Sequence, residues 1–217
     1  MTDRVTALLA SSPALGRASE LTHHPRLPVL PALAGILPGG GLRPGTTVRV
    51  AGVGATSLAL ALMARASAGS WCAAVGLTAL GIVAATELGV DLDHLVVVPD
   101  PGERWPSVAA AAVDAFDVVL ACPPPGVRPH RLTARVRERD AVLIVVGGWP
   151  GADVGIRGVS ARWHGIGRGH GRLAARALEL VVEGRGDAGR GRRATLWLPD
   201  EDGEVAAVRD VTPLRRA

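Results

Sequence analysis

The sequence predicts an α/β protein with a mostly parallel central sheet flanked by helices and extended by C-terminal antiparallel strands. Between residues 46 and 146, short apolar runs rich in Val and Leu alternate with Ala-rich segments of helical length. This alternation is typical of parallel strands joined by covering helices. After residue 150 the alternation stops, and β-rich segments follow one another with turns between them. The 217 residues suffice for one such domain with a modest appendage.

The expected elements follow this alternation along the chain. Residues 4–10 are predicted to form a short helix before a polar linker, and "VLPALAGILPGGGLRPG" adds a helical turn that ends in glycines. We expect strands over 46–52, 71–75, 94–98, 117–121 and 140–146, and helices over 56–68, 79–88, 105–115 and 129–138. The predicted organisation is an N-terminal helix and linker (1–29), a core (30–156) and a basic β extension with a tail (157–217).

The C-terminal third is predicted to add strands to the same sheet. "RLAARALELVVEGRG" alternates as a strand does, and "RRATLWLPDEDGEVAAV" contains two further β segments around an acidic turn. The intervening "GRGDAGRGRR" has the composition of a basic hairpin tip. We interpret these segments as antiparallel edge strands of one sheet and not as a separate domain.

Positive charge is concentrated in this final third. All 24 basic residues are Arg, and residues 1–156 carry as many acidic residues as arginines. The whole formal net charge of +4 therefore lies in 157–217, and residues 157–193 hold nine arginines against three acidic residues. Such a patch attracts nucleic acid or an acidic protein surface.

The cysteines and the N-terminus indicate a cytoplasmic protein. Cys72 and Cys122 lie in apolar surroundings and fit neither a disulfide framework nor a zinc spacing, so we expect buried, reduced thiols. The first residues lack the apolar core of a signal peptide. The window 66–86 has no charge over a membrane-spanning length, but its frequent glycines divide it into a predicted strand and helix.

The stretch "VRVAGVGATSLALALMARAS", residues 48–67, has the outline of a phosphate-binding loop. Gly52 and Gly54 supply the turn, and the hydroxyls of Thr56 and Ser57 stand where such a loop would hold Mg²⁺. The chain has no Lys to neutralise a triphosphate, and three residues separate Gly52 from Thr56 where a working loop has about six. We therefore interpret these four residues as a degenerate phosphate loop.

The second requirement of an ATPase is also absent from the sequence. A metal-holding carboxylate is expected at the end of an apolar strand, but "FDVVLACPP" ends in Ala121 and Cys122, and Asp117 lies at its start. We expect no ATP hydrolysis, no bound cofactor and no metal.

Several segments resemble proteins of the RecA type. "LPALAGILPGGGLRPGTTVRVAG" looks like the entry to a RecA-type core, and "ATELGVDLDHLVVVP" is similar to a helix end and the following strand of bacterial RecA. With "VDAFDVVLACPP" and "RERDAVLIVVGGW", the resemblance covers about residues 30–150 and implies a RecA-like core. The final third, "ARWHGIGRGHGRL" through "RRATLWLP", resembles the ImuA-prime proteins of actinobacteria, accessory proteins of a damage-inducible mutasome.

This resemblance implies a non-catalytic adaptor in the SOS response to DNA damage, acting in error-prone repair by translesion synthesis. The implied partner is an ImuB-like Y-family pseudo-polymerase, and through it an error-prone C-family DNA polymerase and the sliding clamp. The two loops that bind single-stranded DNA in RecA correspond to "PPPGVRPHRL" and "GGWPGADVGIRG", which are short. A single-stranded DNA-binding module and a nucleotide-dependent switch remain alternatives, and self-association stays open.

The basic segment is the candidate binding site. As a metal site it fails, because its two histidines, six residues apart, have no Cys or acidic residue between them. Arginine with tryptophan suits both a protein interface, which we favour, and nucleic acid, while a solvated basic loop beside an edge strand is the third interpretation. The candidate residues are Arg162, Trp163, His164, Arg168, His170, Arg172, Arg176, Arg190, Arg192 and Arg193.

Two further expectations concern packing. In helix 129–138 the arginines 131, 135 and 139 are predicted to form a solvated face, with Leu132 and Val136 turned inward. Among the tryptophans, Trp71 and Trp197 are expected in the core, and Trp149 is expected to be exposed.

Overall fold

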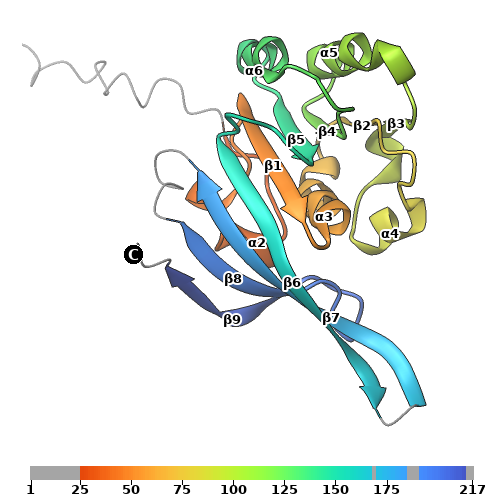
Figure 1. The fold of residues 1–217 in the computed structure, drawn as a ribbon, viewed down its shortest axis with the longest axis vertical. Coiled ribbons are helices and arrows are strands. Elements are labelled where there is room, and N and C mark those ends of the chain that lie inside the picture. Colours follow the sequence, from red (N-terminus) through yellow and green to blue (C-terminus); the bar gives the residue numbers. More distant parts are fainter. Residues whose placement is uncertain (1–24, 168–169, 185–190, 214–217) are drawn as a thin grey trace, which may run out of the picture.

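The computed structural model describes residues 25–167, 170–184 and 191–213, which form one nine-stranded sheet (Figure 1). The strand order is β3-β2-β4-β5-β1-β6-β7-β8-β9, parallel from β3 to β6 and antiparallel from β6 to β9. The strands are β1 (Thr46–Gly52), β2 (Cys72–Val75), β3 (Leu95–Val98), β4 (Val118–Ala121), β5 (Val142–Val146), β6 (Val154–Gly167), β7 (His170–Gly184), β8 (Arg192–Trp197) and β9 (Ala206–Pro213). The predicted fold class is confirmed.

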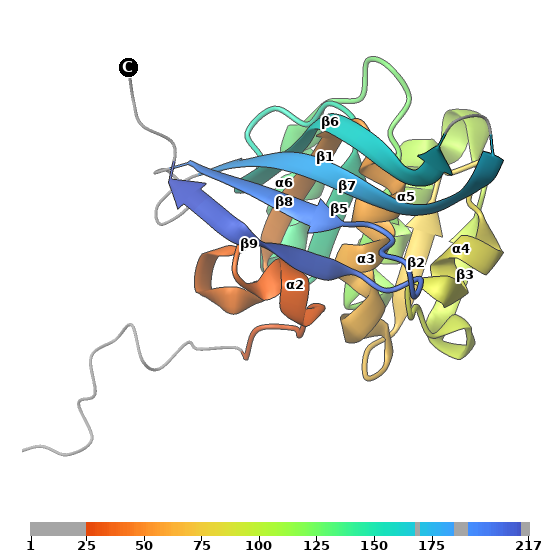
Figure 2. The same cartoon turned by 90° about the horizontal axis from the view of Figure 1, so that it is seen from below.

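Helices cover both faces of the parallel part of the sheet (Figure 2). They are α2 (Pro31–Ala34), α3 (Ala55–Ser67), α4 (Ile82–Glu87), α5 (Trp105–Ala115) and α6 (Pro129–Glu138), with short 3-10 turns at Pro38–Gly40, Leu92–His94 and Gly102–Arg104. Each element predicted between residues 46 and 146 is present, with ends that differ by at most three residues. The helix predicted over 4–10 lies outside the described residues.

The core has two layers because the central strands are buried on both faces. Val118 and Leu120 of β4 pack in the cluster that contains α2 and α3, whereas Val119 and Ala121 pack in the cluster of α5 and α6. The neighbouring strand β5 alternates in the same way. Strands buried on both sides have uniformly apolar sequences, which explains why their positions could be predicted.

The uncharged window 66–86 is divided among three elements. It contains the end of α3, all of β2 and the beginning of α4, as its glycines predicted. Within the described ranges, no helix is long and apolar enough to cross a membrane.

All three tryptophan predictions differ from the structure. Trp71 is 51% exposed, because it precedes β2 and its ring meets only the edge of the His94 ring, at 5.2 Å between centroids. Trp149 is 2% exposed, since the chain turns after β5 and brings its indole against α6, where Nε1 donates to Thr133 Oγ1 at 3.3 Å. Trp197 is half-buried rather than in the core. Of the cysteines, Cys72 is buried, as expected, and Cys122 is half-buried.

The candidate binding segment is a long β-hairpin and not a loop beside an edge strand. β6 pairs in parallel with β1 from Val154 to Gly158 and then continues past it, paired with β7. β8 pairs with β7 only from Ala177 to Val182. Residues 159–167 and 170–176, here called the projecting hairpin, therefore extend beyond the body of the sheet (Figure 1).

Candidate functional site: the degenerate phosphate loop and the projecting hairpin

The degenerate phosphate loop has the strand, turn and helix that the sequence predicts. Gly52 and Gly54 have φ angles of 81° and 70°, in the left-handed region that favours glycine. α3 begins at Ala55, and the amide of Leu58 makes the first helical bond to the Gly54 carbonyl at 2.9 Å. Thr56 is exposed, and no side chain caps the helix.

Strand β6 closes one side of this loop through backbone contacts. The amide of Val53 donates to the carbonyl of Gly158 at 3.1 Å. A Cβ on Gly52 would collide with the Gly158 carbonyl, and a Cβ on Gly158 would collide with the Val53 carbonyl. A phosphate loop needs amides that point at the ligand; here the Val53 amide already has an intramolecular partner.

Strand β7 covers the turn with side chains. A Cβ on Gly54 would lie 3.4 Å from Leu178 Cδ2 and 3.7 Å from Arg176 Nη2. Leu178 is fully buried in the core that contains α3. A leucine thus lies against the start of the helix where a phosphate-binding loop would leave space for an anion.

The guanidinium of Arg176 lies close to Gly54, but it makes its hydrogen bond to another part of the chain. Its Nε donates to the carbonyl of Leu198 at 2.7 Å, and its Cζ lies 5.3 Å from the ring centre of Trp163. Burial lowers the pKa of Arg176 below its ordinary value. The residue therefore fastens the hairpin to the body of the protein.

The end of β4 carries no carboxylate. Ala121 is buried there and Cys122 follows. Asp117 lies at the opposite end of the strand, where its Oδ2 accepts a hydrogen bond from the Trp71 amide at 3.0 Å. Asp117 is therefore used to join the starts of β2 and β4.

The projecting hairpin gathers most of the predicted binding residues. Trp163 and Arg176 are directly opposite each other in the β6–β7 register, and His164 faces Ala175. Trp163 is 45% exposed, and the ring of His164 lies edge-on to that of Trp197 at 4.9 Å between centroids. The predicted residues that share this hairpin and its base are Arg162, Trp163, His164, His170, Arg172 and Arg176.

The structure places Arg192 and Arg193 away from the hairpin. Arg192 and Arg193 pair with Val182 and Val181, and six strand residues between Val182 and Arg176 span about 20 Å. Arg192 instead donates to the Gly35 carbonyl at 3.2 Å and so holds β8 to the end of α2. Arg168 and Arg190 lie outside the described residues.

Apolar residues of the hairpin were missed by the sequence analysis. Val159, Ile166 and Leu173 are 41%, 59% and 52% exposed. Their signal in the sequence was β-branched or large apolar residues between glycines and arginines, whereas the candidate residues had been chosen for charge and aromatic rings. Exposed apolar groups on a projecting ribbon are characteristic of a binding surface.

The fold and this site define a RecA-like α/β protein in which the C-terminal strands β6 and β7 cover the loop between β1 and α3. Residues 35–151 match the family model of the MT3502 N-terminal domain, and the chain belongs to that family. It is 38% identical over 120 residues to the uncharacterized protein Rv3395c of Mycobacterium tuberculosis. That alignment covers 51% of this chain and 56% of the mycobacterial protein, so the chain spans about half the length of the curated relative it matches.

Solved structures with the same fold are distant in sequence. The RadB recombinase has a TM-score of 0.59 at 15% identity, covering 82% of this chain and 97% of its own. The flagellar accessory protein FlaH from Methanocaldococcus jannaschii has 0.54 at 14%, covering 85% and 99%. The KaiC-like protein PH0186 from Pyrococcus horikoshii OT3 has 0.55 at 13%, with the same coverage. These similarities establish the RecA-like fold.

Proposed function

We propose that this protein is a non-catalytic RecA-like adaptor of SOS-induced translesion synthesis, which binds an ImuB-like Y-family pseudo-polymerase through the projecting hairpin. The observation that carries the proposal is the double role of the β6–β7 strands. At their base, Gly158 and Leu178 cover the degenerate phosphate loop. Beyond it, they present exposed apolar side chains among arginines.

The absence of catalysis in this proposal rests on three features of one region. The chain has no Lys, the Val53 amide is bonded to Gly158, and β4 ends in Ala121 and Cys122 without a carboxylate. ATP hydrolysis depends on a lysine, free loop amides and a metal-holding acid together. An adaptor needs none of these three features, because its function is to present binding surfaces to its partners.

A protein partner fits the hairpin better than nucleic acid does. Binding hot spots are enriched in Trp and Arg around an apolar centre, and Ile166 and Leu173 supply that centre. One face of the Trp163 ring is already occupied by Arg176. The backbone of Arg176 is still hydrogen-bonded to Leu198 and Pro199. Beyond residues 158 and 176, the hairpin strands pair only with each other among the described strands, so their outer edges can accept an added strand from a partner.

The choice of partner comes from the resemblance to ImuA-prime proteins, whose pseudo-polymerase connects them to an error-prone C-family polymerase and the sliding clamp. The mycobacterial relative fits an actinobacterial family, and one protein that shares the fold is named as a recombinase. On this proposal the protein acts in the cytoplasm, in DNA repair. The adaptor would then act on DNA through its partners.

Purified full-length protein and pseudo-polymerase provide the test. The variant I166D/L173D places two charges on the projecting hairpin, and we expect its affinity to fall at least tenfold. I82D/V83D is the matched control, because both residues are exposed apolar side chains of α4. Point variants are preferable to truncation near residue 160, which would also remove the core residues Leu178 and Leu180. Equal affinity of I166D/L173D and wild type would refute the hairpin as the partner site.

Direct binding of single-stranded DNA is a second candidate, favoured by the exposed Arg162 and Arg172 on the same hairpin. Arginine contacts to phosphate make affinity fall steeply with salt. The isolated protein should then bind an oligothymidylate at low salt and lose it in R162E/R172E. Lack of binding at low salt removes this candidate.

A further inference from the structure

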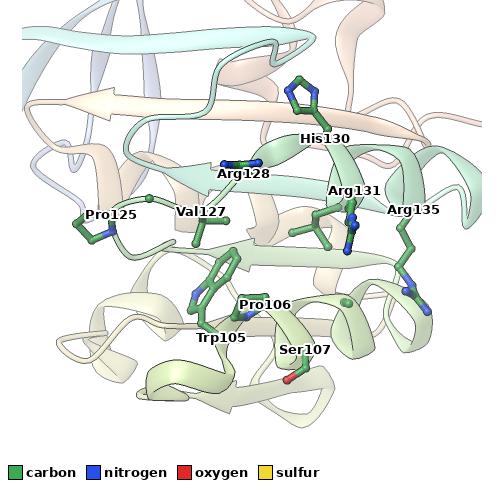
Figure 3. Close-up of a pocket in the computed structure, with 12 residues that line it drawn as sticks. Trp105, Pro106, Ser107, Pro125, Val127, Arg128, His130, Arg131 and Arg135 are labelled. Atoms are coloured by element: carbon green, nitrogen blue, oxygen red, sulfur yellow. The ribbon is translucent and has the colours of Figure 1, made fainter.

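A groove between α5 and α6 lies on the face of the sheet opposite α3 (Figure 3). It has a volume of about 970 Å³. Its apolar lining includes Pro106 of α5, Pro125 and Val127 of the loop before α6, and Leu132 of α6. Trp105 also lines it but is only 2% exposed.

Apart from Ser107 and His130, the polar side chains that line the groove are arginines. Arg128, His130 and Arg131 come from the start of α6, and all three are exposed. No acidic residue lines the groove. Neither the Arg128 nor the Arg131 guanidinium makes a hydrogen bond or ion pair within the part of the chain that the structure describes. The first turns of α5 and α6 also border the groove, and helix N-termini add partial positive charge.

The one acidic residue that links these helices is already used. Asp114 of α5 accepts two hydrogen bonds of 2.6 Å from Arg135, and a third of 3.1 Å from Arg139. Arg135 lines the groove in this paired state, whereas Arg128 and Arg131 keep unbalanced charge. The groove therefore combines an apolar floor with a cationic rim, and its complement is an acidic ligand with an apolar group.

We propose that the α5–α6 groove binds an acidic linear segment of a partner protein, in which Asp or Glu residues flank an apolar side chain. The carboxylates would pair with Arg128 and Arg131, and the apolar group would lie on Pro106 and Val127. Single-stranded nucleic acid fits less well, since it requires exposed rings for base stacking and the only aromatic ring of the indole or phenyl type in this lining is that of Trp105, which is buried.

This second surface extends the proposed function. α5 and α6 lie at the opposite end of the molecule from the tip of the projecting hairpin (Figure 1). Two partners could occupy the two surfaces at once without contact between them. An adaptor that connects two proteins needs such a separated pair of surfaces.

The test uses the full chain and a phage library of random dodecapeptides, followed by fluorescence polarisation with the selected peptides. We expect selection of peptides enriched in Asp and Glu with an apolar residue among them. Their affinity should fall at least tenfold in R128E/R131E and stay within twofold in R162E/R172E. The second variant makes the same change in net charge on the hairpin, and circular dichroism checks that both are folded.

Other outcomes overturn the proposal. These are selected peptides without acidic enrichment, equal weakening by both variants, or tight binding of a twenty-nucleotide oligothymidylate that R128E/R131E abolishes. A concentration-dependent dimer that only R128E/R131E dissociates would instead assign the groove to the acidic turn of a second copy, residues 200–204. Because R162E/R172E and I166D/L173D leave the groove intact, failure here is distinguishable from failure of the hairpin as the pseudo-polymerase site.

Discussion

Arg176 of β7 and Trp163 of β6 lie directly opposite each other, and the guanidinium carbon of Arg176 is 5.3 Å from the centre of the Trp163 ring. The same guanidinium donates a hydrogen bond to the Leu198 carbonyl and lies close to Gly54, which precedes α3. One side chain thus connects the hairpin, the end of β8 and the degenerate phosphate loop. Arg176 therefore holds the proposed binding surface in position, whereas Trp163 is part of that surface.

Trp163→Ala should therefore weaken partner binding with little loss of stability. Because the indole is 45% exposed, we expect the free energy of unfolding to fall by less than about 1 kcal/mol. Affinity for the pseudo-polymerase should fall at least tenfold, about 1.4 kcal/mol. Trp71→Ala is a matched control, since Trp71 is 51% exposed next to β2, far from the hairpin in the strand order. Calorimetry with both variants measures the two effects, and equal affinities for them would contradict the assignment.

Addition of a lysine to the degenerate loop should not produce an ATPase. In Ala55→Lys the ammonium would enter a loop whose Val53 amide is bonded to Gly158 and whose turn is covered by Leu178. We expect neither wild type nor variant to bind ATP with Mg²⁺ at micromolar concentrations, and neither to release phosphate. Titration calorimetry and a phosphate-release assay, with an active RecA-fold ATPase as positive control, measure this. Micromolar affinity in wild type would support the nucleotide-dependent switch instead.

Gly158→Ala should destabilise the protein through the loop contact. The new methyl group would collide with the Val53 carbonyl, so β6 must shift away from β1 or the loop must move. We expect a loss of about 2 kcal/mol or more in urea unfolding. Gly148→Ala is the control, since Gly148 is exposed and a Cβ there meets no atom within 4 Å. The control should change stability by less than about 0.5 kcal/mol. Equal stability of both variants would mean that this contact is not tight.

The contrast between Gly158 and β5 explains which features could be predicted. β5 is apolar on both faces, so its own residues are sufficient to predict a buried strand. The function of Gly158 depends on Val53, more than a hundred residues away, and no local pattern marks such a pairing. The contact of β6 with the degenerate phosphate loop could therefore not be predicted from the sequence. The absence of a lysine from this loop and of a carboxylate from the end of β4 could be.

A solvated basic loop was one of three interpretations of the segment that forms the projecting hairpin. Gly165 and Gly171 lower the expected β-propensity of this segment. In the structure their φ angles are 106° and 107°, next to a register shift between His164 and Ile166. A Cβ on Gly171 would collide with the Gly165 carbonyl. The two glycines permit a β-bulge and a close approach of the two hairpin backbones. The hairpin therefore requires glycine at these positions.

Alkaline pH should reveal the burial of Cys72 in a chain that has few other groups titrating there. Burial, together with the nearby carboxylates of Asp117 and Asp91, raises the pKa of this thiol from 9.0 to about 12. Between these pH values the unfolded chain loses the thiol proton and the folded chain keeps it, so the free energy of unfolding decreases as pH rises. The sequence has neither Lys nor Tyr, whose pKa values near 10 would otherwise dominate this range.

The measurement is urea unfolding at several pH values from 8 to 11. We expect wild-type stability to decline above pH 9, and Cys72→Ala to lower stability at pH 8 but to lack most of the further decline. Cys122→Ala is the matched control, since it removes the other cysteine and leaves Cys72 in place. A slope that disappears in Cys122→Ala and persists in Cys72→Ala would reverse the assignment. The absence of any slope in wild type would mean that the Cys72 thiol ionises as readily in the folded protein as in the unfolded chain.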